Sequence, residues 1–201
     1  TYKTKIKMKN IIFKNNSNGD DGINLINSEF NLEDIALENI NADGIDLDYS
    51  IGKIKNFSCK TCFNDAIDIS NTTLYLENFK AADVYDKALS IGEYSKFYAE
   101  GLEIQNANIG LAVKDGSSAK VKNILIKSTK FPITTYIKKK EFGPAKIELK
   151  TVLLEENLNP IFIEEGTEFK IDEETINKLI KENLYNTLYP NAEYRNSLWK
   201  I

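Results

Sequence analysis

A phrase of about eight residues recurs along this chain at a constant interval of 22 positions. Residues 41–48 read NADGIDLD, residues 63–70 read FNDAIDIS and residues 85–92 read YDKALSIG. Two mainly aliphatic columns stay in step over six repeats without a gap: Ile23, Ile45, Ile67, Leu89, Leu111, Ile133 and Leu25, Leu47, Ile69, Ile91, Val113, Thr135. A fixed period of this length is the signature of a solenoid, in which each repeat packs mainly on its neighbours.

The repeat is too short for a pair of helices, which needs roughly 33 residues or more. Each repeat instead holds short apolar runs separated by Asn, Asp and Gly, a pattern typical of strands and turns. The sequence therefore predicts an all-β fold, a right-handed parallel β-helix of six or seven 22-residue coils. The second apolar cluster slips by one position after Ile91-Gly92-Glu93, which predicts a longer turn there.

Residues 161–201 are expected to cap this solenoid, which occupies residues 1–160. The stretch 161–172 reads as two strands around Gly166, and Asp172 is placed to N-cap a helix over 173–188. Ile176, Leu179, Ile180 and Leu184 follow at helical spacing. Because the chain begins inside the repeat pattern, an upstream domain of a longer protein is also expected.

The composition excludes several kinds of site. The sequence has no histidine, which removes histidine bases, histidine metal ligands and Ser-His or Cys-His nucleophile pairs. The net charge of −4 argues against nucleic-acid binding, and no apolar run approaches the roughly 18 residues of a membrane-inserted helix. Cys59 and Cys62 lack the further ligands of a zinc site and are expected to be small, unpaired core residues.

Alternation along the strands assigns a direction to each column. Ile45 and Leu47 point inward, so Asp46 and Asp48 point outward. Asn56, Asn78 and Asn123, with Asp34 in register, fall at a coil corner and are expected to form a ladder of side-chain amides. Asp43 and Asp65 are expected to be exposed turn residues, each followed by a small residue where the turn is tight.

These phrases resemble the right-handed β-helix, pectate-lyase-like superfamily, and three of them resemble catalytic phrases of polygalacturonase-type glycoside hydrolases. Asn41-Ala42-Asp43, Asn64-Asp65, Asp86-Lys87-Ala88 and Ala112-Val113-Lys114 stand at the matching positions. Asn64 replaces one aspartate of that family's pair, Lys87 replaces its histidine, and its substrate-binding arginine is missing. A closer resemblance is to bacterial β-helix domains with phrases such as DGIDLD and DKALSIGE, some beside spore-coat-type kinase-fold domains in surface proteins.

The outward residues form a candidate site that is acidic on the early coils and basic on the later ones. Asp43, Asp65 and Lys87 are its catalytic candidates, and the candidates for ligand binding are Asp46, Asp48, Asp68, Glu93, Lys114, Asp115, Tyr136 and Lys138. Carboxylates one coil apart are about 5 Å from each other, so each raises the pKa of its neighbour. A protonated acid beside an ionised base is what glycosidic hydrolysis requires. Lys87 is a candidate to bind a sugar carboxylate or, if its pKa is lowered, to act as a base.

Three functions remain open at this stage. The first is a non-catalytic carbohydrate-binding domain of a bacterial secreted or cell-surface protein, with a polysaccharide as its partner. The second is a divergent glycoside hydrolase or polysaccharide lyase that acts on an acidic glycan. The third is a structural spacer or adhesin segment. No organic cofactor is indicated, although the carboxylate stack also suits Ca²⁺. The sequence has no long insertion between coils to wall a site, which counts against catalysis.

Overall fold

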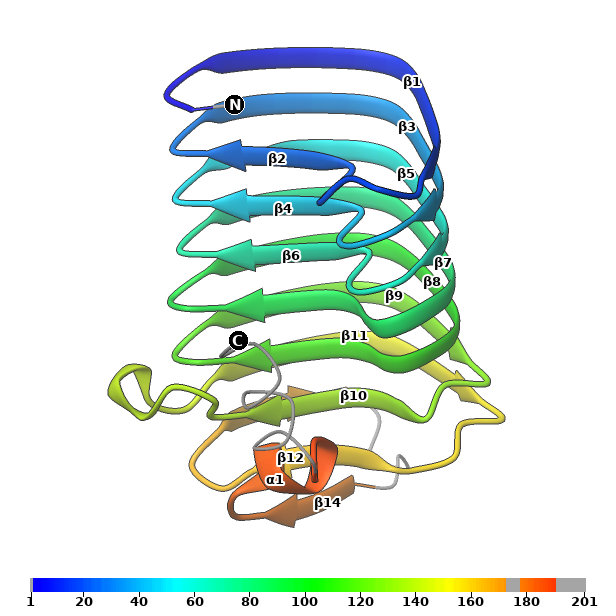
Figure 1. The fold of residues 1–201 in the computed structure, drawn as a ribbon. Coiled ribbons are helices and arrows are strands. Elements are labelled where there is room, and N and C mark those ends of the chain that lie inside the picture. Colours follow the sequence, from blue (N-terminus) through cyan, green and yellow to red (C-terminus); the bar gives the residue numbers. More distant parts are fainter. Residues whose placement is uncertain (1, 173–177, 191–201) are drawn as a thin grey trace, which may run out of the picture.

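The computed structural model is an all-β parallel solenoid of about eight turns (Figure 1). It describes residues 2–172 and 178–190. One ladder of parallel strands consists of β1 (Lys5–Asn16), β3 (Glu29–Ile40), β5 (Ile51–Cys62), the first parts of β7 (Thr73–Gly92) and β8 (Lys96–Lys114), β9 (Ser118–Lys127), β11 (Lys146–Glu155) and β13 (Glu168–Ile171). We call this the long-strand ladder.

The other side of each turn is a shorter strand. This short-strand ladder consists of β2 (Ile23–Ile26), β4 (Ile45–Asp48), β6 (Ile67–Ser70), the last parts of β7 and β8, β10 (Phe131–Tyr136), β12 (Ile161–Glu164) and β14 (Lys178–Lys181). A 3₁₀ turn, η1 (Lys140–Phe142), and a short helix, α1 (Leu184–Leu188), complete the described elements. No helix within these described ranges is long and apolar enough to cross a membrane.

The predicted register is confirmed strand by strand. Ile45 pairs with Ile67, and Ile67 with Leu89, one coil further along. These side chains are buried in a core that runs the length of the solenoid. The predicted longer turn is confirmed at Glu93 and Tyr94, which both have a positive φ, and the spacing between paired strands becomes 23 residues there.

The coils turn their corners through residues in the left-handed region. Asn56 and Asn78 have φ near +57°, and Gly101 continues the same corner with φ of +75°. The expected amide ladder is confirmed from Asp34 to Asn78, because the Asn78 amide donates to Asn56 Oδ1 at 2.9 Å and the Asn56 amide donates to Asp34 Oδ1 at 2.7 Å. Asn123 lies outside it, since its amide donates to Glu100 Oε1 at 3.4 Å. The local side-chain bonds explain why Asn and Asp occupy these corners.

The turn that enters each short strand is closely packed. A Cβ atom on Gly44 would lie 2.5 Å from the carbonyl oxygen of Ala66, one coil away. Only a glycine fits at such a distance. The small residues in this column therefore follow from contact between successive coils.

The expected helix over 173–188 is wrong for residues 178–183 and is present only at its C-terminal end. Residues 173–177 lie outside the described ranges, Lys178–Lys181 form strand β14, and α1 covers only Leu184–Leu188. The two expected strands around Gly166 are present as β12 and β13. Since β12, β13 and β14 pair in parallel with the preceding coils, the winding extends further than the six or seven turns expected.

The cysteine prediction is half right. Cys59 and Cys62 are buried in the core, but they form a disulfide and are not unpaired. Thr61 between them has a φ of +61°, so the bond spans a coil corner. The corner lets both cysteines face inward in spite of their spacing of three residues.

Candidate functional site

A cleft of about 720 Å³ lies on the outer face of the short-strand ladder. Its lining comes from several coils and from the C-terminal segment: Phe63, Asn64, Asp65, Asp68, Tyr85, Asp86, Lys87, Ser90, Asn108, Lys114, Lys130, Tyr136, Lys138, Tyr185, Leu188, Tyr189 and Pro190. We call it the short-strand cleft. The wall of this cleft comes not from an insertion between coils, which the sequence lacks, but from α1 and the two described residues after it.

A small second core attaches α1 to the later coils. The outward positions that are polar on early coils become apolar here, at Ala112 and Phe162, and both lie with Leu184 and Leu188 in this core. Glu164 holds the start of α1, since its carboxylate accepts the backbone N–H groups of Asn183 and Leu184 at 3.0 and 2.8 Å. The position of this wall thus depends on contacts between distant parts of the chain.

The catalytic candidates Asp43 and Asp65 are not exposed turn residues. They have exposed fractions of 9% and 1%. The Asp43 carboxylate accepts the backbone N–H of Asp65 at 2.7 Å, and the Asp65 carboxylate accepts that of Lys87 at 2.9 Å. Their first role is therefore structural, because each carboxylate bonds the backbone of the following coil.

Burial raises the pKa values of the outward-facing aspartates on the early coils. Burial, together with the nearby Asp65 carboxylate, raises the pKa of Asp43 to about 8. Burial and the neighbouring Asp48 and Asp68 raise the pKa of Asp46 to about 7. The pKa of Asp48 is also raised, by burial and by Asp68. The expected proton-holding carboxylates therefore exist. Asp43, Asp46 and Asp48 do not line the cleft, but Asp65 does, and burial raises its pKa to about 7 in spite of the nearby Lys87 ammonium.

Lys87 is the centre of a buried ionic network. Its ammonium lies 3.0 Å from Asp65 Oδ1 and 2.5 Å from Asp86 Oδ2. Burial alone would lower the pKa of Lys87, but the two carboxylates raise it well above its usual value. Lys87 therefore keeps its proton and cannot act as the base of an elimination, which corrects one of its expected roles.

Asp86 is a member of this network that the sequence did not single out. Burial would raise the pKa of Asp86, but the Lys87 ammonium and three hydrogen bonds lower it below its usual value. The Tyr189 hydroxyl donates to Asp86 Oδ1 at 2.8 Å across 103 positions of sequence. The adjacency of Asp86 to Lys87 in the repeated phrase was the one signal for it.

Lys114 and Lys138 bring positive charge to the cleft. The Lys114 ammonium donates to Ser90 Oγ at 3.0 Å and lies 3.7 Å from Asp68 Oδ1. Lys138 lines the same cleft, where loss of water contact lowers its pKa and the neighbouring Lys114 and Lys87 lower it further. Among the described residues, the Lys138 ammonium has no ion pair within 4.0 Å.

Of the remaining predicted residues, two form structural contacts outside the cleft and one lines it. Asp115 is fully buried and accepts the backbone N–H groups of Lys138 and Lys139 at 2.8 and 2.7 Å, so it holds the loop after β10. Glu93 forms an ion pair with Lys139 outside the cleft. Tyr136 lines the cleft but is only 1% exposed, because it packs against Tyr185 and Tyr189.

The sequence reasoning also missed an aromatic pair at the rim of the cleft. The rings of Phe63 and Tyr85 stack with their centroids 4.9 Å apart, and the two residues are 49% and 62% exposed. They stand 22 positions apart at the start of the repeated phrase, which is the signal that would have found them. The cleft therefore combines an exposed aromatic surface with charged side chains.

No group of three or more acidic, cysteine or histidine side chains converges to hold a metal ion within residues 2–172 and 178–190. Comparison of the chain with protein-family models, with curated proteins and with solved structures finds no match. The fold and the site geometry are thus the basis for the functional argument.

Proposed function

We propose that this protein is a non-catalytic carbohydrate-binding solenoid, and that its short-strand cleft binds a glycan bearing acidic groups. The observation that carries the proposal is the Lys138 ammonium, which forms no ion pair within the described residues and lines the same cleft as Lys114, Lys87 and the exposed Phe63–Tyr85 pair. Burial lowers the pKa of Lys138, and the Lys114 and Lys87 ammonium groups lower it further; an anionic group bound beside Lys138 would offset that repulsion.

The aromatic pair supplies the second half of the argument. The C–H face of a pyranose ring packs on an aromatic ring, while its hydroxyl groups bond to surrounding polar side chains. Phe63 and Tyr85 offer such a surface, and Asn64 and Asn108 line the cleft beside them. A uronic-acid unit stacked here would direct its carboxylate toward the lysines.

The hydrolase and lyase alternatives receive less support from the geometry. The carboxyl with a pKa near 8, Asp43, is absent from the cleft lining. Asp65, whose pKa is raised to about 7, and Asp86, whose pKa is lowered, both line the cleft, but Asp65 is only 1% exposed and both carboxylates pair with the Lys87 ammonium. No described pair of an accessible acid and base is therefore arranged for glycosidic cleavage.

A bacterial secreted or surface location belongs to the same proposal. The Cys59–Cys62 disulfide supports it, because such bonds persist mainly in oxidising compartments. A polysaccharide of the cell surface or surroundings is the partner that fits this location.

Titration calorimetry with oligosaccharides of glucuronic, galacturonic and mannuronic acid tests the cleft. We expect one of them to bind, and Lys138→Ala to weaken binding by about tenfold, since an ion pair in a partly dry site is worth about 1.4 kcal/mol. Lys140→Ala is the matched control, because Lys140 is exposed on η1 and outside the cleft. The proposal fails if all three acidic series leave the wild type unbound, or if the two variants behave alike.

The same oligosaccharides distinguish binding from catalysis. Incubation with the protein should leave each chain length unchanged and generate neither new reducing ends nor unsaturated uronates. Release of shorter products that depends on Asp65 would support the enzyme alternative instead.

A further inference from the structure

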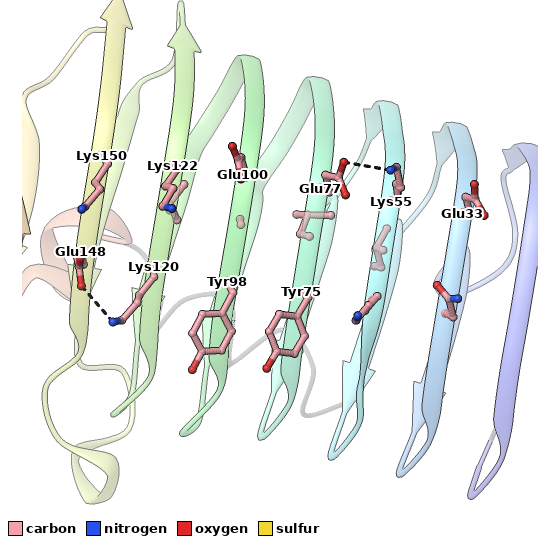
Figure 2. A pocket seen from close by; sticks show the side chains of 16 residues that line it. Glu33, Lys55, Tyr75, Glu77, Tyr98, Glu100, Lys120, Lys122, Glu148 and Lys150 are labelled. Carbon is pink, nitrogen blue, oxygen red and sulfur yellow. Dashed lines mark ion pairs between the residues drawn. The ribbon is translucent and has the colours of Figure 1, made fainter.

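A second hollow of about 850 Å³ lies on the outer face of the long-strand ladder (Figure 2). It crosses β3, β5, β7, β8, β9 and β11, and it shares no lining residue with the short-strand cleft. We call it the long-strand groove. Concave surfaces that cross many repeats are the usual binding faces of solenoids.

Two tyrosines project side by side from the middle of this groove (Figure 2). Tyr75 and Tyr98 are paired across β7 and β8, and their rings lie 5.0 Å apart at an angle of 13°. They are 45% and 36% exposed. Lys53 and Lys120 occupy the same row one coil to either side, and the Lys53 ammonium lies 6.0 Å from the Tyr75 ring. The row is therefore a pair of stacked aromatic rings with a lysine on either side.

The neighbouring outward row is charged but balanced. It runs Glu33, Lys55, Glu77, Glu100, Lys122, Lys150 along successive strands, with three residues of each sign. Lys55 and Glu77 form an exposed ion pair at 3.2 Å, while Lys122 and Lys150 form none within the described ranges. Since the row carries both signs in equal number, the groove is complementary neither to a polyanion nor to a polycation.

We propose that the long-strand groove binds a neutral polysaccharide chain that crosses the strands and packs its sugar rings on the exposed side of the stacked Tyr75–Tyr98 pair. The 5.0 Å between the two tyrosine rings matches the spacing of strands in a parallel sheet. Glu77 and Glu100 lie beside the tyrosines and can accept hydrogen bonds from sugar hydroxyls, and Lys120 and Lys122 can donate them.

Other polymers fit this surface less well. A peptide that adds to a sheet does so at an exposed edge, whereas the groove is a sheet face. An amphipathic helix needs an apolar trough, and nucleic acid needs a basic face. The mixture of aromatic rings with balanced carboxylates and ammonium groups is what a neutral, hydroxyl-rich chain requires. The inference does not depend on the short-strand cleft.

Calorimetric titration with cellohexaose, xylohexaose, mannohexaose and chitohexaose tests the groove. We expect at least one of them to bind, with little change in affinity as salt is raised, because no ion pair with the ligand is involved. Tyr75→Ala with Tyr98→Ala should weaken binding by about tenfold or more, whereas Tyr75→Phe with Tyr98→Phe keeps the rings and should stay within about threefold of the wild type.

The Phe63→Ala/Tyr85→Ala variant of the short-strand cleft is the second control and should bind the neutral chain as the wild type does. Thermal unfolding checks that all variants are folded. The inference is overturned if none of the four hexasaccharides binds, if the Ala pair at positions 75 and 98 binds normally, or if neutral chains depend on the cleft pair instead. Binding of acidic oligosaccharides alone would overturn it and leave the function proposed for the cleft intact.

Discussion

At the scale of single residues, the column of Asp43, Asp65 and Lys87 shows how one position changes its role from coil to coil. The carboxylates of Asp43 and Asp65 each accept a backbone N–H of the next coil. At the third position a lysine stands in place of the aspartate, and its ammonium pairs with the Asp65 carboxylate one coil earlier. The change from Asp to Lys limits the number of buried negative charges in one column, which would otherwise repel one another.

Asp65→Asn is expected to destabilise the fold. The amide oxygen can still accept the Lys87 backbone N–H, but the buried Lys87 ammonium keeps only one carboxylate, Asp86. Loss of half of a buried ionic network should cost about 1–3 kcal/mol of unfolding free energy, measured by urea denaturation.

Asp43→Asn is the matched comparison. Its amide oxygen still accepts the Asp65 backbone N–H, and the charge that is removed is one that burial disfavours. At about pH 8.5 this variant should be as stable as the wild type or more stable. An Asp43→Asn protein that loses as much stability as Asp65→Asn would refute the assigned difference between the two carboxylates.

The same carboxylates make stability depend on pH. The pKa values of Asp43, about 8, and Asp46, about 7, are above those of the unfolded chain, so the folded state binds more protons between roughly pH 4 and pH 8. Stability should therefore fall as the pH rises through this window. Thermal unfolding should give a lower Tm at about pH 8.5 than at about pH 5.5, and the Asp43→Asn/Asp46→Asn variant should show a smaller difference.

At the scale of elements, the coil corners give a direct test of why asparagine recurs. Asn78 adopts a φ of +57° and bonds Asn56 through its amide. Asn78→Ala should cost about 1–2 kcal/mol of unfolding free energy, because it loses the bond and strains the left-handed backbone. Asn78→Gly should cost less, since Gly101 already occupies this corner one coil further on. Equal losses for both variants in urea denaturation would mean that the backbone conformation contributes nothing.

Most strands were predictable because the 22-residue spacing of apolar residues in the sequence equals the spacing of paired residues in the ladders. The failure at the C-terminus has a clear cause. Leu179 and Ile180 have helical spacing relative to neighbouring apolar residues, but they extend the parallel ladder as partners of Phe162 and Ile163. The free edge of β12 offers backbone hydrogen-bond partners, which the spacing of apolar residues along the sequence does not reveal. Pairing with that edge therefore outweighs the local preference for a helix.

At the scale of the whole molecule, the period predicted which side chains are neighbours but not which are covered. Asp65, Asp68, Lys87, Lys114, Tyr136 and Lys138 do come together in one cleft. The burial of Tyr136 and the hydrogen bond to Asp86 could not be predicted, because both involve Tyr189, which lies in the C-terminal segment. The two exposed aromatic pairs follow the period and were predictable in principle.

The solenoid architecture also predicts which coils unfold when one core residue is disrupted. Leu47 is fully buried and pairs with Leu25 and Ile69 in the adjacent coils. Leu47→Asp places an unpaired carboxylate in the core and should unfold the coils around β4, because burying such a charge costs several kcal/mol. In a solenoid each coil contacts mainly its neighbours, so hydrogen exchange should lose protection from β2 to β6 first.

The later coils, from β9 to β12, should keep more of their protection in the Leu47→Asp protein. Ala82→Asp is the matched control, since it adds the same carboxylate at an outward position between Lys60 and Gln105 and should leave the exchange pattern intact. Uniform loss of protection across all coils in Leu47→Asp would show that the solenoid unfolds as one cooperative unit. In that case the interfaces between coils, and not the stability of each coil, would dominate its folding energy.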